Sequence, residues 1–201
     1  MENTKTITIA VEDEKKISKT TLTNSGIACS VGEIKKKMRV KVFEGGQAPT
    51  YKNGNWMDTF VREAYVLPKD HVGKSFDMND LMFEYYGKGK VTYEEGDVVV
   101  LKLGFALELL PNHELWLVPR SGTFRKTGLI LTNSKGIGDD SFIGDNDEYS
   151  ACMLATRESS FNIGDRLIQM RVAEAMGDKY SFEQVESFGN ADRGAFGTTG
   201  K

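Results

Sequence analysis

Glycine divides this 201-residue chain into short segments, since it occurs 21 times against four prolines. The segments between these turn signals are rich in β-branched residues, which favour strands. No segment shows a long apolar period of the helical kind. The sequence therefore predicts an all-β fold with one or two short helices, and its 39% hydrophobic content allows one principal core.

Seven segments have the composition of strands, and two have the boundary residues of short helices. The predicted strands are 5–11, 38–43, 97–107, 113–119, 128–132, 149–156 and 165–172. One helix is predicted over 78–86, with Asp77 available as its N-cap. The second, over 121–127, is expected to end at Gly128.

Charge and composition exclude several classes of protein. The 26 Lys and Arg against 29 Asp and Glu give a formal net charge of −3, so there is no overall positive field for a polynucleotide. No run approaches the roughly 18 apolar residues of a membrane helix, and the polar first residues do not resemble a signal peptide. Two distant cysteines, Cys29 and Cys152, are too few for a disulfide framework or a zinc site. We expect a cytoplasmic protein, in the host cell if it is virus-encoded, that binds neither polynucleotide nor membrane.

The chain is expected to divide into a main domain with additions. We predict an N-terminal extension over 1–37, a β-barrel domain over 38–192 with an insertion at about 68–93, and a mobile C-terminal arm over 193–201. The arm is too rich in glycine and threonine to pack alone.

Two segments offer groups for an anionic ligand. Arg120 precedes a predicted helix, where the backbone N–H groups of Ser121 and Gly122 can donate to a phosphate; Pro-Arg-Ser-Gly is equally typical of an ordinary turn. Gln169 is a lone amide in an apolar strand, so it faces either solvent or a site.

The segment 132–149 is predicted to be a β-hairpin in which glycine lets the backbone approach a flat ligand. Asp139 there can accept a proton from a water molecule. We interpret the other acidic residues of this loop as a solvated surface. In the tail, Arg193, Phe196 and the glycine-flanked pair Thr198 and Thr199 supply a cation, an aromatic face and a backbone nest for phosphates.

In this order the segments resemble the trimeric dUTP pyrophosphatase (dUTPase) family, which has five ordered motifs. The matching segments are GNWMDTFVRE (54–63), PRSG (119–122), NSKGIGDDSFIGD (133–145), GDRLIQM (164–170) and RGAFGTTG (193–200). The resemblance implies a jelly-roll-like β-barrel and a homotrimer with active sites at the subunit interfaces. It also implies Mg²⁺-dependent hydrolysis of dUTP to dUMP and pyrophosphate.

The resemblance also assigns roles residue by residue. Asp139 matches the carboxylate that deprotonates the attacking water and meets the sugar 3′-hydroxyl. Asn133 and Gly136 match the positions that read uracil, and Phe142 matches an aromatic, usually Tyr, that packs on the deoxyribose and excludes ribonucleotides.

The other matching positions hold the triphosphate and its metal. Arg120, Ser121, Gly122 and Gln169 match phosphate contacts, and Asp58 matches a residue that holds hydrated Mg²⁺ through water, so no direct protein ligand is expected. In the arm, Arg193 matches a contact to the terminal phosphate and Phe196 the aromatic that covers uracil, and Gly197, Thr198 and Thr199 match the closing loop.

Some positions depart from the family pattern. Thr59 replaces an apolar residue in the first motif, Gly138 stands where Val or Ile is usual, and residues 68–93 lengthen the chain between the first two motifs. Extra segments of this kind occur in virus-encoded members. They motivate a first alternative, a dUTPase-like regulatory protein acting through protein partners; a second alternative is a relative of dCTP deaminase.

Overall fold

The computed structural model describes residues 5–10, 16–23, 26–33, 36–71 and 84–191. The chain forms two compact units, Met1–Arg39 and Val40–Lys201. The first unit contains one antiparallel sheet in the order β1-β2-β3. Its strands are β1 (Lys5–Ala10), β2 (Lys16–Thr23) and β3 (Gly26–Glu33).

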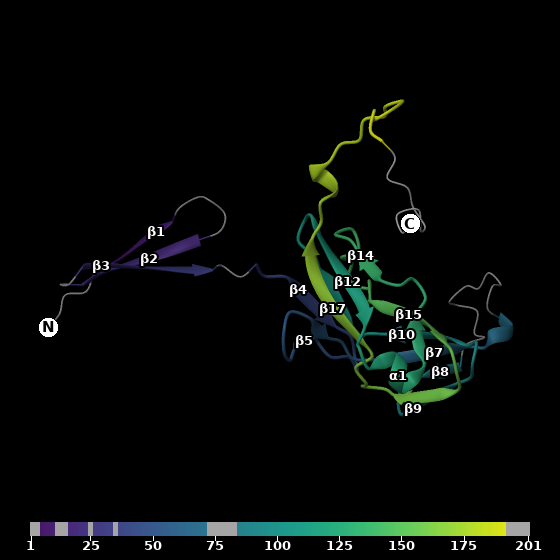
Figure 1. The fold of residues 1–201 in the computed structure, drawn as a ribbon. Helices are drawn as coiled ribbons and strands as arrows, with labels where there is room; N and C mark the ends of the chain where they lie inside the picture. Colours follow the sequence, from purple (N-terminus) through teal and green to yellow (C-terminus); the bar gives the residue numbers. More distant parts are fainter. Residues whose placement is uncertain (1–4, 11–15, 24–25, 34–35, 72–83, 192–201) are drawn as a thin grey trace. The chain divides into compact units, whose positions relative to one another are not determined.

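Two antiparallel five-stranded sheets make up most of the second unit (Figure 1). One has the order β13-β15-β10-β7-β8, with strands Leu129–Leu131, Ser150–Ala155, Val98–Lys102, Glu63–Leu67 and Glu84–Tyr86. The other has the order β14-β12-β17-β6-β5, with strands Gly136–Gly138, His113–Pro119, Ile168–Glu174, Met57–Asp58 and Thr50–Tyr51. Among the described strands, neither sheet closes on itself, so the arrangement is one of two open sheets.

Shorter elements complete the second unit. Two further strand pairs are β4 (Arg39–Val42) with β11 (Phe105–Glu108), and β9 (Lys90–Tyr93) with β16 (Ser159–Asn162). The helical turns are α1 (Thr123–Thr127), η1 (Lys69–His71) and η2 (Gly177–Lys179). In the described part of the chain, no helix has the length and apolarity needed to cross a bilayer.

The core is formed by apolar side chains of the two large sheets. Val99, Leu101 and Met153 from one sheet and Leu115 and Ile168 from the other have no exposed surface. A second cluster on the opposite face of β10 contains Leu67, Val98 and Val100. Strand β10 is therefore buried on both faces, which explains its unbroken run of valine and leucine.

The all-β prediction is confirmed, and each predicted strand overlaps an observed one. The strand predicted over 165–172 is observed as β17, three residues later at its start, and one further difference has a clear cause. The segment predicted as one strand over 97–107 is divided into β10 and β11 at Gly104, which has a φ of +75°. A Cβ on Gly46 would lie 2.5 Å from the carbonyl oxygen of Gly104, so two backbones meet here as the chain passes from one sheet to its neighbour.

One predicted helix is confirmed and the other is not. Helix α1 ends where expected, with Gly128 in the left-handed conformation. Of the helix predicted over 78–86, residues 78–83 lie outside the described residues, and Glu84–Tyr86 is strand β8, so that end of the prediction is wrong. Tyr85 pairs with Tyr65 on β7, with ring centroids 5.0 Å apart, and such cross-strand aromatic pairs stabilise sheets.

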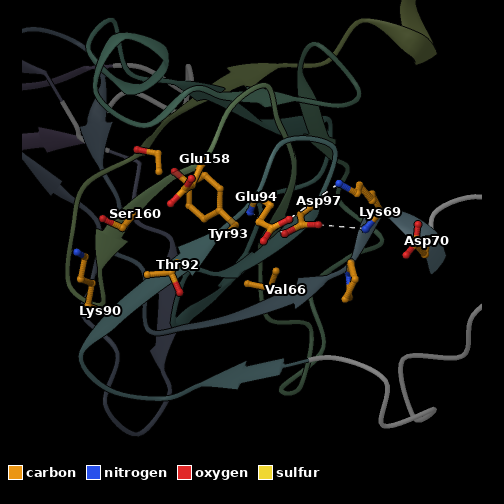
Figure 2. Close-up of a pocket in the computed structure, with 12 residues that line it drawn as sticks. Val66, Lys69, Asp70, Lys90, Thr92, Tyr93, Glu94, Asp97, Glu158 and Ser160 are labelled. Carbon is orange, nitrogen blue, oxygen red and sulfur yellow. Dashed lines mark hydrogen bonds and ion pairs between the residues drawn. The ribbon is translucent and has the colours of Figure 1, made fainter.

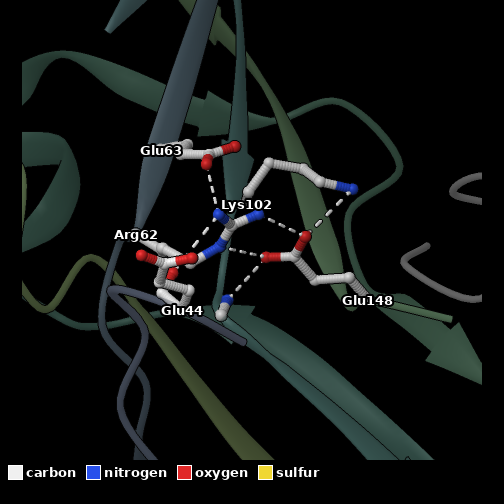
Figure 3. A network of polar contacts seen from close by, with 6 residues as sticks. Glu44, Arg62, Glu63, Lys102 and Glu148 are labelled. Atoms are coloured by element: carbon white, nitrogen blue, oxygen red, sulfur yellow. Dashed lines mark hydrogen bonds and ion pairs between the residues drawn. The ribbon is translucent and has the colours of Figure 1, made fainter. Parts of the chain in front are cut away.

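A buried ion-pair network joins the ends of several strands (Figure 3). Glu148 is 8% exposed and accepts hydrogen bonds from Arg62 Nε at 3.0 Å and Nη2 at 2.8 Å. Its Oε1 also accepts the N–H of Gly104 at 2.9 Å, and Lys102 Nζ lies 3.6 Å from its Oε2. Arg62 contacts Glu63 as well.

Burial alone would raise the pKa of Glu148. The hydrogen bonds from Arg62 and Gly104 and the charge of Lys102 outweigh it and lower the pKa below its ordinary value. A carboxylate whose pKa is lower in the folded state stabilises the fold at pH values above its unfolded pKa. This contribution is lost as the pH falls through the folded pKa.

We predict that Glu148→Gln lowers the free energy of unfolding by roughly 1.5–3 kcal/mol at pH 7, because it removes the charged acceptor that pairs with Arg62 and Lys102 and leaves the half-buried Arg62 to Glu63. The difference from the native chain should shrink as the pH falls from about 4.5, the ordinary pKa of a glutamate, through the lower pKa that Glu148 has in the folded state. Urea unfolding at several pH values measures this, with Glu95→Gln, at an exposed position, as the control. A deficit independent of pH would show that the charge of Glu148 is not what stabilises the network.

Candidate functional site

Asp58, on β6, is the centre of a cluster of charges. It is 7% exposed, and its Oδ1 forms an ion pair with Arg120 Nε at 2.7 Å, while its Oδ2 accepts a hydrogen bond from Arg166 Nη1 at 2.6 Å. Arg120 Nη1 also lies 3.4 Å from the carbonyl oxygen of Arg166. Because two cations share one carboxylate, the cluster keeps a net positive charge and a fixed guanidinium geometry, which suits a phosphate ligand.

Gln169 lies beside this cluster. It is opposite Asp58 on one side and Val118 on the other, and its Nε2 donates to the carbonyl oxygen of Pro119 at 3.3 Å. Ser121 is exposed and Gly122 caps α1, directly after Arg120. The structure thus brings Asp58 together with the predicted phosphate contacts.

The segment 132–149 differs from a simple hairpin. Its flanking strands β13 and β15 do pair, as predicted. Between them, however, β14 crosses to the other sheet and pairs with β12, with Gly138 opposite Leu115 and Gly136 opposite Leu117. The interior of the predicted hairpin is therefore a loop that connects the two sheets.

A second group of predicted residues lines a pocket of about 380 Å³ in this loop. The predicted residues that line it are Asn133, Gly136, Asp139 and Phe142. The exposed Asp139 accepts two hydrogen bonds at Oδ1 from Ser141, one from its hydroxyl at 2.5 Å and one from its N–H at 2.9 Å. These two hydrogen bonds hold the pKa of Asp139 below its ordinary value, and the bond from the hydroxyl contributes most. The carboxylate is therefore ionised at neutral pH.

Tyr149 forms the floor of this pocket. It is 4% exposed, its ring stacks on Phe105 at 5.3 Å, and Phe142 meets it edge-on at 5.2 Å. Its hydroxyl is buried and has no hydrogen-bond partner among the described residues. Burial, with the charges of Asp139 and Asp147, raises the pKa of Tyr149 to about 12.

Tyr149 also explains the glycine at position 138. A Cβ on Gly138 would lie 2.6 Å from Cε1 of Tyr149, closer than any side chain allows. The sequence showed that Gly138 is unusual but not why. The sequence predicts no role for Tyr149 or Arg166, although Arg166 lies within the matching segment 164–170.

The two groups lie apart on a single chain. Asp58 is on β6 and Gly138 is on β14, which are separated by β12 and β17 in the same sheet. Three strand spacings amount to roughly 14 Å. The arm residues Arg193, Phe196, Gly197, Thr198 and Thr199 lie outside the described residues.

A larger pocket, of about 660 Å³, contains none of the predicted site residues (Figure 2). Its most buried carboxylate, Asp97, accepts the N–H of Lys69 at 3.0 Å and that of Glu94 at 2.8 Å. Tyr93 donates its hydroxyl to the carbonyl oxygen of Thr127 at 2.7 Å. These polar groups bind one another, so we do not place chemistry in this pocket.

Comparison with curated proteins decides the family. The chain is 37% identical over 110 residues to the SPbeta prophage-derived deoxyuridine 5′-triphosphate nucleotidohydrolase of Bacillus subtilis (strain 168), covering 55% of this chain and 77% of that protein. It is 32% identical over 117 residues to the deoxyuridine 5′-triphosphate nucleotidohydrolase of Neorickettsia sennetsu, covering 56% of this chain and 75% of that protein. The chain belongs to the dUTPase family. No family model matches it.

Solved dUTPase structures share its fold. A mutant of the dUTPase of Staphylococcus bacteriophage 80alpha, solved with dUpNHpp, superposes with a TM-score of 0.54 at 16% identity, over 83% of this chain and all of that chain. A mutant of the dUTPase of phage phi11 of S. aureus, described with a structural Mg(II) ion, gives a TM-score of 0.50 at 17% identity, over 76% of this chain and 99% of that chain. The jelly-roll prediction is thereby confirmed.

We predict that Gly138→Ala lowers the free energy of unfolding by roughly 1–3 kcal/mol, because the new methyl group overlaps the Tyr149 ring. The loss should be smaller when Tyr149 is already Leu, since the shorter side chain makes room. Urea unfolding of the two single variants and the double variant measures this coupling. Gly177→Ala, where a Cβ meets nothing within 4 Å, is the control. Equal losses in both backgrounds would mean that Tyr149 does not require glycine at position 138.

Proposed function

We propose that this chain hydrolyses dUTP to dUMP and pyrophosphate, which limits uracil incorporation into DNA and supplies dUMP. The observation that carries this proposal is the pocket that joins an ionised Asp139 to Phe142, Asn133 and Gly136. Membership of the dUTPase family supports it. The working site would be the domain over 38–192 with the arm over 193–201, in the cytoplasm of the cell or host.

Asp139 is the proposed general base. Its carboxylate accepts a proton from a water molecule as the water oxygen attacks the α-phosphorus in line with the leaving group. A new P–O bond forms to the water oxygen, and the bond from the α-phosphorus to the bridging oxygen breaks. Pyrophosphate leaves with the bonding electrons.

The same pocket supplies the proposed selectivity. Asn133 and the backbone at Gly136 offer a fixed pattern of donors and acceptors that fits uracil and leaves the amino group of cytosine without a partner. Phe142 packs on the deoxyribose, where a 2′-hydroxyl finds neither space nor a hydrogen bond.

The cluster at Asp58 is the proposed triphosphate site. Arg120, Ser121, Gly122 and Gln169 would contact phosphate oxygens, and the arm would add Arg193 to the terminal phosphate. Phe196 would cover uracil, and Gly197, Thr198 and Thr199 would close the loop over the site.

Mg²⁺ is the proposed cofactor, held by phosphate oxygens and water, as this ion prefers. An ionised carboxylate has about four acceptor positions. The two arginines occupy one position on each oxygen of Asp58, so positions remain for the water of a hydrated ion. When bound, the ion would neutralise charge on the triphosphate. Asp58 itself would fix Arg120 against the phosphates.

A homotrimer with sites between subunits accounts for two features of the single chain. The first is the separation of Arg120 from Asp139 within one chain. Gly138 lies opposite Leu115 on β12, and Arg120 stands five positions further along that strand, roughly 17 Å away, which is too long for one chain to bring both side chains to one α-phosphate. The second is the segment after β17, which exposes Tyr180, Phe182 and Phe188 at 60%, 98% and 84%. Apolar side chains so exposed indicate a surface that another copy covers.

We predict that Asp139→Asn lowers the turnover of dUTP by roughly 10²–10⁴-fold and leaves substrate affinity within about tenfold, because the amide keeps the shape but cannot take the proton. Pyrophosphate release with each deoxynucleoside triphosphate measures activity and selectivity together. Asp140→Asn is the matched control, since the carboxylate of Asp140 instead accepts the N–H of Asn112. Near-normal turnover in Asp139→Asn would exclude it as the base, and equal release from dCTP would refute uracil selectivity.

A further inference from the structure

Ser141 is the residue that fixes the carboxylate of Asp139. The chain turns between Asp139 and Phe142, where the N–H of Phe142 donates to the carbonyl oxygen of Asp139 at 3.1 Å. Within this turn Ser141 donates twice to the same carboxylate oxygen, Oδ1, from its hydroxyl at 2.5 Å and its N–H at 2.9 Å. Both bonds end on Oδ1, which leaves Oδ2 to accept the proton of a water molecule.

We propose that Ser141 is a positioning residue for Asp139, which holds Oδ1 so that Oδ2 faces the attacking water. This inference rests on the proposed hydrolysis and adds to it a residue that acts only through the base. An exposed aspartate otherwise samples several rotamers, and each lost hydrogen bond widens that range. A reaction that needs the base within hydrogen-bond reach of water is sensitive to such a loss.

The turn also sets the base relative to the sugar. Ser141 lies between Asp139 and Phe142, and Phe142 is held edge-on against the buried ring of Tyr149. The turn is thus anchored at one end by aromatic packing and at the other by the bonds to Oδ1. The hydroxyl of Ser141 therefore connects the position of the base to that of the ring proposed to pack on deoxyribose.

Among the described residues, the titratable groups in and beside the pocket of Asp139 stay neutral or have partners of their own, so a change of its titration on removing Ser141 can be assigned. Tyr149 has a pKa of about 12 and is neutral at working pH. The carboxylate of Asp140 accepts a hydrogen bond from the N–H of Asn112 at 2.7 Å. The carboxylate of Asp147 accepts one from the N–H of Gly144, also at 2.7 Å. Glu148 is held by Arg62 and Lys102.

Two changes are expected in Ser141→Ala. Turnover of dUTP should fall by roughly 10- to 100-fold, the range expected for a hydrogen bond to a charged group. The pKa of Asp139 should rise toward its ordinary value, because the hydroxyl is the largest cause of its lowering. The acid limb of the profile of kcat/KM against pH should therefore move to higher pH.

The test compares the native chain, Ser141→Ala and Ser141→Thr in pyrophosphate release from dUTP between about pH 2.5 and 8, a range that includes the acid limb of an aspartate. Carboxyl ¹³C NMR titration of Asp139 over the same range is a readout independent of activity. Ser141→Thr keeps the hydroxyl and should restore turnover and the native acid limb. Ser160→Ala, in the distant strand β16, should leave both unchanged.

An acid limb and a ¹³C titration that do not move in Ser141→Ala would overturn the inference, even if thermal stability fell, because that pattern belongs to a merely structural turn. Failure of the native chain to hydrolyse dUTP would instead refute the proposed function. The NMR titration would then still show whether Ser141 controls the carboxylate.

Discussion

The carboxylate of Asp58 determines where positive charge is presented on this protein. It is buried in the sheet, and an unpaired charge in such a place would cost several kcal/mol. Arg120 and Arg166 bind one oxygen each, so both guanidinium groups are held near the end of β12. The pairing is satisfied within one chain, and the cluster still carries an excess of positive charge for a polyanionic ligand.

Sheet geometry then limits what one chain can do. The proposed base follows β14 at one edge of the sheet, while Asp58 lies on β6, next to the opposite edge strand β5. Arg120 follows the end of β12, whereas Gly138 lies opposite Leu115 near the start of that strand, so roughly 17 Å of strand separates Arg120 from the base. Each copy carries the proposed triphosphate contacts around Asp58 and, apart from them, the proposed base and uracil pocket around Asp139. In the proposed homotrimer each site would be completed by two copies, and the exposed aromatic residues after β17 offer a surface for that association.

Much of the fold follows from local sequence, and the exceptions arise from contacts distant in the chain. Helix α1 and its end at Gly128 were predictable because a left-handed glycine is a local signal. The division at Gly104 was not, since it depends on the close approach of Gly46, and β8 depends on Tyr65 across the sheet.

The site shows the same contrast. Asp139, Phe142 and Arg120 stand in ordered motifs and could be named from the sequence. The pairing of Arg166 with Asp58, 108 positions away, and the overlap that requires glycine at 138 need tertiary contacts that no local pattern contains.

Subunit complementation tests the central claim most directly. Asp139→Asn and Arg120→Ala chains, each with its own tag, are co-expressed, and assemblies that carry both tags are isolated. If each site takes Asp139 from one copy and Arg120 from another, every trimer that carries both tags has about one site in three with both native residues, and dUTP hydrolysis returns. Mixed assemblies that remain as inactive as either parent would contradict the account, because both residues would then have to act from the same chain.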